Sequence, residues 1–526
     1  MSTNKPTALI VGAGFGGLGA ACLLSKAGYN VTVVEKNEMV GGRASLFHVT
    51  KNRYGTWKVT GSKPRKNTPQ FRFDMGPSWY LMPDVFEHFF NLLGEDVNEL
   101  LDLRKLSPSY RIFYKDENKQ VDIYSDLQKD LPTVEALEAG AGEALKRYLD
   151  QSKYQYEVAK DRFMYKNYDS IKDFFTREMA VEGRKLSVLR TMDKYVSKYF
   201  KTDEMRKIMQ YPLVFLGSSP YNTPAIYNIM SHIDFNMGVY YPQGGIYTIV
   251  EKLRSIAQKN GTKFLLNAPV KKIIVKKGSA KGVRLQDGAV FSADIVISNA
   301  DTKFTEQKLL EPKYRTKSKK YWQKRTLAPS ALIMYLGVKG KLPSLKHHNL
   351  LFSQDWKQNF TEIFDKPQWP SDPSLYVCNP SKTDPSVAPK DHENLFVLVP
   401  VAPGLSYSQK ELEKYADKTL RTMESEMNLP HLRDKIVFQR LFSVKDFTAR
   451  YNAQEGTALG LAHTLKQTAI FRPNNISKKV KNLYYVGAGT NPGIGMPITL
   501  ISAELLYKRL VGDSSAGPLT KDQINP

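Results

Sequence analysis

Cysteine is nearly absent from this chain, and its scarcity limits the classes of protein to consider. The 526 residues include only Cys22 and Cys378, far apart and in chemically ordinary surroundings. A disulfide framework or a cysteine metal cluster needs more cysteines at closer spacing, so we expect neither a disulfide nor a bound metal. A reducing cytoplasm fits this composition best.

Apolar runs long enough to cross a membrane are also missing. Residues 8–24 form a run of 17 residues without a charged side chain, but five of them are glycine. These glycines would weaken an inserted helix, and a strand, a turn and a helix explain the run better than a signal peptide does. Because a membrane span needs about 20 consecutive apolar residues, we expect any contact with a bilayer to be peripheral.

Acidic residues are outnumbered by basic ones, 52 against 76, which gives a net charge of +24. Such an imbalance favours an anionic partner, either nucleic acid or phospholipid head groups. The densest basic stretch, residues 313–325, interleaves lysine and arginine with Tyr314, Tyr321 and Trp322. That pattern suits a membrane interface and also fits an ordinary solvated helix face. The chain carries no nucleic-acid-binding motif, so we expect no nucleic-acid partner.

A short buried strand near the N-terminus runs directly into a glycine-rich turn. The strand is predicted over residues 8–11 and the helix after the turn over residues 16–26. A second strand, residues 31–34, ends at Glu35. This unit is typical of dinucleotide binding, because the glycines admit the pyrophosphate, the helix N-terminus attracts it, and the acid binds the adenosine ribose. The predicted contacts are Gly12, Ala13, Gly14, Phe15, Gly16, Gly17, Glu35 and Lys36.

Two further features favour FAD over NAD. Gly41 and Gly42 allow a close pass by the cofactor, and Arg43 can neutralise its phosphates. Near the C-terminus a strand over residues 483–486 leads into a second glycine-rich loop, from which we predict contacts by Gly487 and Gly489. A nicotinamide enzyme has no need of such a second site.

The helix after this second loop supports the same cofactor. It is predicted over residues 496–510, and Met496 and Pro497 begin it, with proline in the first turn where it is favoured. Its positive end would face the loop, where a reduced flavin carries negative charge. We therefore predict that Met496 and Pro497 contact the flavin.

Between the two glycine-rich loops the pattern changes twice. Residues 120–235 are mainly helical and rich in tyrosine, methionine and phenylalanine, as in an insertion that carries substrate contacts. A helix over 247–259 and strands over 263–266, 271–275 and 293–298 follow. The last predicted strands lie at 331–338, 374–378 and 395–401, consistent with a substrate domain built on a sheet.

This order of elements resembles the FAD domain of the glutathione-reductase type. The resemblance implies an α/β fold with a Rossmann FAD-binding domain, a mixed-sheet substrate domain and a helical insertion. It places Val270 beside the adenine, and Asn299 and Ala300 on the flavin side. The predicted division is 1–119, 236–303 and 450–526 for the FAD-binding domain, 120–235 for the helical insertion and 304–449 for the substrate domain.

Five motifs, in order along nearly the whole chain, resemble those of the bacterial and fungal carotenoid desaturases, the phytoene desaturases. They are residues 12–17, 40–43, 73–78 with Met82-Pro83, 471–473, and 486–493 with Met496-Pro497. The resemblance adds Gly76, Pro77 and Ser78 to the predicted cofactor contacts. Asn491 departs from the histidine common at its position in that family, which argues against an imidazole there.

The resemblance implies FAD-dependent removal of hydrogen from a long polyene precursor, phytoene towards lycopene, by an enzyme on the inner face of the cell membrane. A hydrocarbon offers no polar handle, so we expect an apolar tunnel and name Trp79, Tyr80 and Met82 as its lining. Hydride transfer to the flavin followed by loss of a proton would complete the desaturation. The sequence identifies no catalytic base, since the candidates His232, Asp234, Arg450 and Glu504 each suit a structural role.

Other functions stay open at this point. A carotenoid cis-trans isomerase or a C30 desaturase of the diapophytoene type would share every motif. A flavin amine oxidase shares the nucleotide-binding architecture, but its cationic substrate would be repelled by a protein of net charge +24. A prenyl-lipid escort protein of the Rab GDP-dissociation-inhibitor type is the non-enzymatic alternative. The electron acceptor and the oligomeric state are not encoded in these patterns.

Overall fold

A five-stranded parallel sheet forms the centre of the predicted nucleotide-binding part. The computed structural model describes residues 5–61, 64–65, 68–117, 119–170 and 190–524. The strand order is β10-β2-β1-β14-β20, and every pairing in the sheet is parallel. The strands are β1 (Thr7–Val11), β2 (Asn30–Val34), β10 (Lys263–Leu265), β14 (Ile295–Ser298) and β20 (Leu483–Tyr485). Each overlaps a strand predicted from the sequence.

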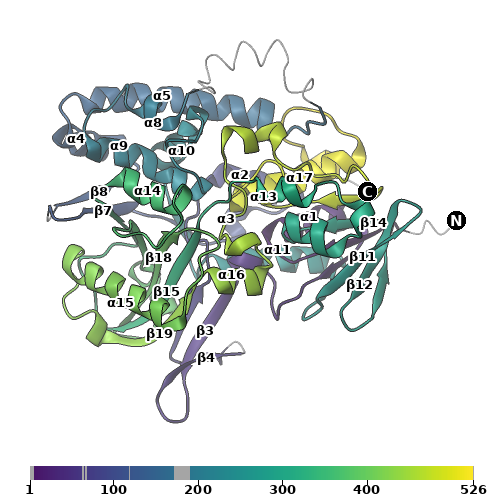
Figure 1. Ribbon diagram of the computed structural model, residues 1–526, viewed down its shortest axis with the longest axis horizontal. Coiled ribbons are helices and arrows are strands. Elements are labelled where there is room, and N and C mark those ends of the chain that lie inside the picture. Colours follow the sequence, from purple (N-terminus) through teal and green to yellow (C-terminus); the bar gives the residue numbers. More distant parts are fainter. Residues whose placement is uncertain (1–4, 62–63, 66–67, 118, 171–189, 525–526) are drawn as a thin grey trace.

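Helices from both ends of the chain pack together on this sheet, as Figure 1 shows. The helix α1 is buried along nearly its whole length, which explains why its sequence is apolar on every side. The principal helices here are α1 (Phe15–Lys26), α2 (Pro83–Leu93), α11 (Tyr247–Lys259) and α17 (Met496–Val511). Three of these were predicted from the sequence, and α2 was not.

A second, larger sheet has seven strands in the order β19-β15-β18-β17-β16-β7-β8. Its strands are β7 (Tyr110–Tyr114), β8 (Lys119–Ile123), β15 (Ser330–Lys339), β16 (His348–Phe352), β17 (Leu375–Cys378), β18 (His392–Val401) and β19 (Ile436–Phe442). The pairing of β7 with β16 is parallel and the others are antiparallel, so this is a mixed sheet as predicted.

The predicted boundary at residue 119 falls inside this second sheet. The hairpin β7–β8 joins the sheet through β16, so residues 110–123 pack with residues 330–442 rather than with the nucleotide-binding part. The cause is apolar burial: Tyr110, Ile112 and Tyr114 belong to the same core cluster as Leu350 and Phe352 of β16. A parallel partner so far along the chain leaves no local signal in the sequence.

The helical insertion covers one end of the larger sheet (Figure 1). Its described helices are α4 (Leu127–Leu137), α5 (Ala141–Ala159), α8 (Met192–Val196), α9 (Asp203–Gln210) and α10 (Ile229–Ser231). The predicted helical character of residues 120–235 is therefore observed from residue 127 onward, while its part at 171–189 lies outside the described residues. None of the helices that the structure describes is long and apolar enough to cross a bilayer.

Smaller elements complete the fold. The meander β11 (Val270–Lys276), β12 (Ser279–Leu285) and β13 (Val290–Ser292) flanks the five-stranded sheet. The remaining strands are β3 (Leu46–Lys51), β4 (Trp57–Thr60), β5 (Gln70–Asp74), β6 (Leu103–Lys105) and β9 (Tyr240–Pro242). The remaining helices are α3 (Val97–Leu100), α12 (Thr302–Phe304), α13 (Lys319–Gln323), α14 (Trp356–Phe364), α15 (Gln409–Glu426) and α16 (Val444–Tyr451).

Candidate cofactor and substrate cavity

One large cavity, of about 830 Å³, connects the two sheets and the helical insertion. Its wall includes both glycine-rich loops, the turn at residues 76–78 and apolar side chains of the insertion. Segments at the two ends of the sequence therefore line the same space. Most of the wall is apolar, and its charged side chains include Glu35, Lys36, Arg43 and Arg450.

The two glycine-rich loops approach each other too closely for side chains. A β-carbon added to Gly16 would lie 2.8 Å from the α-carbon of Gly487, and one added to Gly14 would lie 2.7 Å from Nδ2 of Asn299. Gly12 and Gly487 also have φ values of +96° and +94°, which glycine adopts without strain. The glycines thus leave bare backbone against the cavity, as a dinucleotide site requires.

Glu35 is held in place for the ribose contact predicted from the sequence. Its Oε2 accepts a 2.8 Å hydrogen bond from the backbone N–H of Ala13, and its Oε1 accepts hydrogen bonds from Asn37. Burial raises the pKa of the carboxyl above its ordinary value, and these hydrogen bonds act in the opposite direction. Ala13 therefore supports Glu35 from behind and does not itself line the cavity.

Arg43 is the feature that best fits a phosphate. Its side chain lines the cavity, and its buried Nε has no hydrogen-bond partner among the described residues. Burial lowers the pKa of the guanidinium, which lies 5.2 Å from the ring of Tyr451. Bound FAD would supply the phosphate oxygens that this donor lacks. Lys36 lies on the same wall, where its Nζ donates a 2.7 Å hydrogen bond to the carbonyl of Ala449.

The structure brings most of the predicted cofactor contacts together around the cavity. Those that line it are Gly12, Gly14, Phe15, Gly16, Glu35, Lys36, Gly42, Arg43, Gly76, Pro77, Ser78, Val270, Asn299, Ala300, Gly487, Gly489, Met496 and Pro497. Ala13 and Gly17 do not line it. A β-carbon on Gly17 would collide with the carbonyl of Gly12, so this glycine lets the helix begin close to the strand.

Arg472 fixes the C-terminal glycine-rich loop, a role the sequence did not reveal. The buried guanidinium donates hydrogen bonds to the carbonyls of Ala488 at 2.8 Å and Thr490 at 3.2 Å. An imidazole also reaches this loop, but from His463, which lines the cavity against Gly493. Burial lowers the pKa of His463 to about 3, so this ring is neutral. Although Asn491 carries no imidazole, the loop therefore still has one beside it, which comes from His463.

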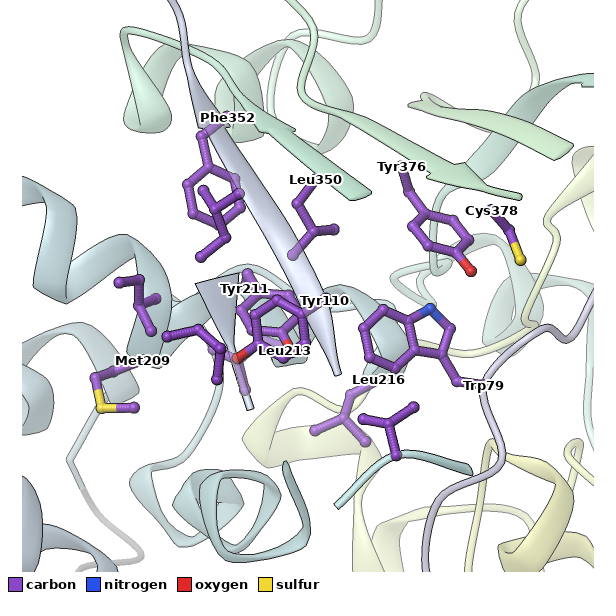
Figure 2. Close-up of a cluster of buried hydrophobic side chains, with 14 of the residues drawn as sticks. Trp79, Tyr110, Met209, Tyr211, Leu213, Leu216, Leu350, Phe352, Tyr376 and Cys378 are labelled. Atoms are coloured by element: carbon purple, nitrogen blue, oxygen red, sulfur yellow. The ribbon is translucent and has the colours of Figure 1, made fainter. Parts of the chain in front are cut away.

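The substrate part of the cavity is bordered by a row of aromatic rings. Ring centroids lie 6.4 Å apart between Trp79 and Tyr211, 6.2 Å between Tyr211 and Phe352, and 5.1 Å between Phe352 and Trp356. We call these four residues the aromatic wall. Figure 2 shows Tyr211 between Trp79 and Phe352. The wall leads from the turn at residues 76–78 to α14 and offers a hydrocarbon only apolar faces.

Tyr80 lies elsewhere than predicted. Trp79 and Met82 line the cavity, whereas the Tyr80 ring is fully buried and stacks on Phe86 at 4.3 Å in the core beside α2. Tyr80 forms an isolated antiparallel bridge with Tyr240 of β9, and its ring faces Phe86 of α2 instead of the cavity. The sequence also failed to identify Tyr211, Phe352 and Trp356. Of these, only Tyr211 lies within residues 120–235, whose aromatic richness predicted substrate contacts.

The four titratable candidates for a catalytic base all have structural partners. Glu504 binds His88 at 2.9 Å, Arg450 binds Glu38 at 2.7 Å, and His232 Nδ1 is 2.8 Å from Nδ2 of Asn236. Asp234 accepts hydrogen bonds from Tyr110 at 2.8 Å and Tyr211 at 2.9 Å. Burial raises the pKa of Asp234 to about 7.

Comparison with known proteins agrees with this geometry. The family model of flavin containing amine oxidoreductases matches residues 15–505. Carotenoid 3,4-desaturase of Haloarcula japonica is 45% identical over 505 residues, which cover 96% of this chain and 98% of the relative. The zeta-carotene-forming phytoene desaturase of Myxococcus xanthus is 35% identical over 97% of this chain and 95% of its own. The chain belongs to the carotenoid desaturases of the flavin-containing amine oxidoreductase family. This desaturase is an FAD-dependent oxidoreductase.

Solved structures support the fold class. An oxidoreductase of Methanosarcina mazei superimposes with a TM-score of 0.60 at 19% identity, covering 95% of this chain and 100% of that one. Putrescine oxidase gives 0.59 at 15% identity over 97% and 98% of the two chains. Rab GDI of Plasmodium falciparum gives 0.54 at 14% identity over 98% and 99%. At such identities these likenesses show the fold alone.

Proposed function

We propose that this desaturase removes hydrogen from an acyclic C40 carotenoid precursor, phytoene towards lycopene. The observation that carries the proposal is the single cavity in which the nucleotide cradle at Gly14 and Arg43 opens onto the aromatic wall. A hydrocarbon lying along that wall would reach the part of the cavity bordered by Pro77 and Ser78. Apolar walls exclude water there, which protects a cationic intermediate from hydrolysis.

The residues of the chain bind and orient, and FAD, when bound, would supply the hydride acceptor. Arg43 and the glycine backbone would hold its phosphates, and Glu35 would hold its ribose. The faces of Trp79 and Tyr211 stabilise positive charge on the substrate by about 1 to 2 kcal/mol each where water is excluded. Shape and apolar contact then select the substrate, because a polyene has no polar group to recognise.

A second substrate is favoured by the comparison. The relative from Haloarcula japonica, at 45% identity, is named for desaturation at the 3,4 bond. An already conjugated C40 carotenoid would fit the same apolar wall, and it would then react at one end of its chain. The choice between these substrates depends on how far a polyene enters the cavity.

We also propose that the enzyme works in the cytoplasm, on the inner face of the cell membrane, where its substrate is stored. The support is the exposed basic face formed by Lys319, Lys320 and Lys324 on and beside α13. The sequence pattern placed Trp322 at this interface, but its side chain is only 1% exposed because its ring packs with Leu327 and Leu461. Binding would therefore be mainly electrostatic.

Expression in two bacterial hosts tests the substrate. One host accumulates phytoene and the other lycopene, and the pigments are identified by absorption and mass. Conversion of phytoene to a red lycopene-like product supports the first proposal, and loss of hydrogen from lycopene alone supports the second. A product of unchanged mass would indicate an isomerase, and reaction only in a host that makes the C30 analogue would indicate a diapophytoene-type enzyme.

A further inference from the structure

A chain of hydrogen bonds leads from the cavity wall to a buried imidazole. The Ser78 hydroxyl lies 2.7 Å from the phenol oxygen of Tyr376, and that oxygen lies 2.8 Å from Nδ1 of His348. Ser78 and Tyr376 line the cavity, whereas His348 is completely buried behind them. These are polar groups placed beside an otherwise apolar wall, in the place where the substrate is proposed to react.

We propose that Ser78, Tyr376 and His348 form a relay that takes up the proton lost during desaturation. This inference rests on the proposed function and names the base that the sequence left unidentified. Removal of hydride leaves a cation on the substrate, and a neighbouring C–H bond then breaks to give the new double bond. The Ser78 hydroxyl oxygen accepts that proton and donates its hydroxyl proton to the phenol oxygen of Tyr376. Tyr376 in turn donates its phenol proton to His348 Nδ1.

Atoms and electrons balance in this desaturation. The two electrons of one C–H bond leave as hydride to FAD, and those of the second form the new double bond. The proton of the second C–H bond ends on His348 as imidazolium. When the product leaves and water re-enters the cavity, the three transfers reverse and Ser78 releases the proton there.

The surroundings of His348 suit a short-lived positive charge. The indole of Trp79 lies parallel to the imidazole, with centroids 4.1 Å apart and planes inclined by 7°. An indole face stabilises a cation placed over it, and more strongly where water is excluded. His348 Nε2 is buried without a hydrogen-bond partner among the described residues, so no carboxylate holds the ring permanently charged.

A weak base is sufficient at this position. Burial and the neighbouring His347 lower the pKa of His348 well below its ordinary value. A carbocation is a far stronger acid than imidazolium, so transfer to such an imidazole still runs downhill. A low pKa also returns His348 to its neutral form once the reaction is over, which readies the relay for the next turnover.

The experiment compares Tyr376→Phe, His348→Gln and the double variant in the FAD-loaded enzyme. Each single variant is expected to lower kcat about 100-fold, the order of a general-base contribution. The double variant is expected to fall no further, because one broken link disables the whole relay. The wild type is expected to show a solvent isotope effect in D₂O that both single variants lose. Flavin content and melting temperature report whether each variant is folded.

Tyr241→Phe is the matched control. Its phenol is buried in the same core cluster as Tyr376, but its hydroxyl donates to Oδ2 of Asp384 at 3.3 Å and takes no part in the relay. We expect this variant to keep kcat and the isotope effect. If the His348 variant fails to fold, Ser78→Ala carries the test, with an expected fall in kcat of at least about 10-fold.

Three results would overturn the relay. They are a Tyr376→Phe enzyme with undiminished kcat, losses that add in the double variant, and a stoichiometric metal lost in His348→Gln and Cys378→Ser. The last is relevant because donor atoms of His347, His348 and Cys378 lie within 4.8 Å of one another.

A readout independent of activity is ¹⁵N NMR of labelled histidine, in which Ser78→Ala is expected to shift the resonance of His348 Nδ1. A wild type inactive on every polyene would refute the proposed function instead, and the NMR result would stand separately.

Discussion

Gly16 and Gly487 lie against each other: a β-carbon on Gly16 would lie 2.8 Å from the α-carbon of Gly487. Because that neighbour is backbone, it cannot move aside as a side chain would. Gly16→Ala is therefore expected to push the two cofactor loops apart and to weaken FAD binding at least about 10-fold, equivalent to about 1.4 kcal/mol. Titration of the apoprotein with FAD, followed by flavin fluorescence, measures the loss.

Gly61→Ala is the control for this substitution. Among the residues that the structure describes, no atom beyond its chain neighbours lies within 4 Å of the position of its β-carbon, so FAD affinity is expected to stay at the wild-type value. Equal FAD affinity in the Gly16→Ala variant and the wild type would show that the two loops do not form one binding site.

Trp356 ends the aromatic wall on α14, and its removal opens the cavity there. Trp356→Ala is expected to raise KM for the polyene about 10-fold or more, because burial of a large aromatic face contributes about 1.5 to 3 kcal/mol. The substituted position lies apart from the glycine-rich loops, so FAD content is expected to be unchanged. Initial rates in detergent or vesicle dispersions of the polyene give KM and kcat separately.

Loss of a tryptophan also destabilises a protein in general, so Trp369→Ala serves as the comparison. Trp369 packs on Tyr407 and Tyr415 beside α15 and does not line the cavity. Its removal is expected to lower the melting temperature with KM unchanged. A similar rise of KM in both variants would mean that stability alone, and not contact with the polyene, explains the result.

The parts of this fold that were predictable are those with a local signal. The strand before Gly12, the helix α11 and the strand β15 each have their own periodicity and punctuation, and the structure confirms them within a residue or two. The glycine-rich loops were informative for the same reason, since bare backbone at fixed spacing has few other uses.

The parts that were missed depend on partners far along the chain. The pairing of β7 with β16 is set by burial of Tyr110 and Ile112 against Leu350, which no local pattern reports. Tyr80 was assigned to the cavity because it lies just beyond the turn at residues 76–78, but it packs into the core. The link from Ser78 to His348 likewise crosses three separate segments, so only the folded chain reveals it.

Asp234 predicts a pH dependence of stability. Burial raises its pKa to about 7 from the ordinary 3.8, so the folded protein favours the protonated carboxyl. Its contribution to stability is therefore complete below about pH 4 and is lost as the pH rises through about 7. Asp234→Asn stays neutral, so its melting temperature is expected to rise relative to the wild type between pH 5 and pH 8. Thermal unfolding of both proteins across this range gives the difference curve.

Asp294→Asn tests whether such a curve is specific to burial. Asp294 is near the surface, and hydrogen bonds from Thr7 lower its pKa. Its stabilisation is present above its unfolded pKa and is lost only as the pH falls, so the difference curve is expected to be flat above about pH 5. A flat curve for Asp234→Asn as well would show that this carboxyl ionises normally.

The basic face on α13 predicts how the enzyme meets a membrane. Lys319, Lys320 and Lys324 are exposed, and each lysine near an anionic surface contributes about 1 kcal/mol of attraction. The triple variant Lys319→Glu, Lys320→Glu and Lys324→Glu is expected to bind vesicles containing phosphatidylglycerol at least about 10-fold more weakly than the wild type. Added salt is expected to weaken vesicle binding by the wild type in the same way. Co-sedimentation measures both effects.

The same charge change on α15, at Lys410, Lys414 and Lys418, is the control, because those exposed lysines lie over a different part of the fold (Figure 1). Equal losses in the two triple variants would mean that net charge, and not the α13 face, directs the protein to the bilayer.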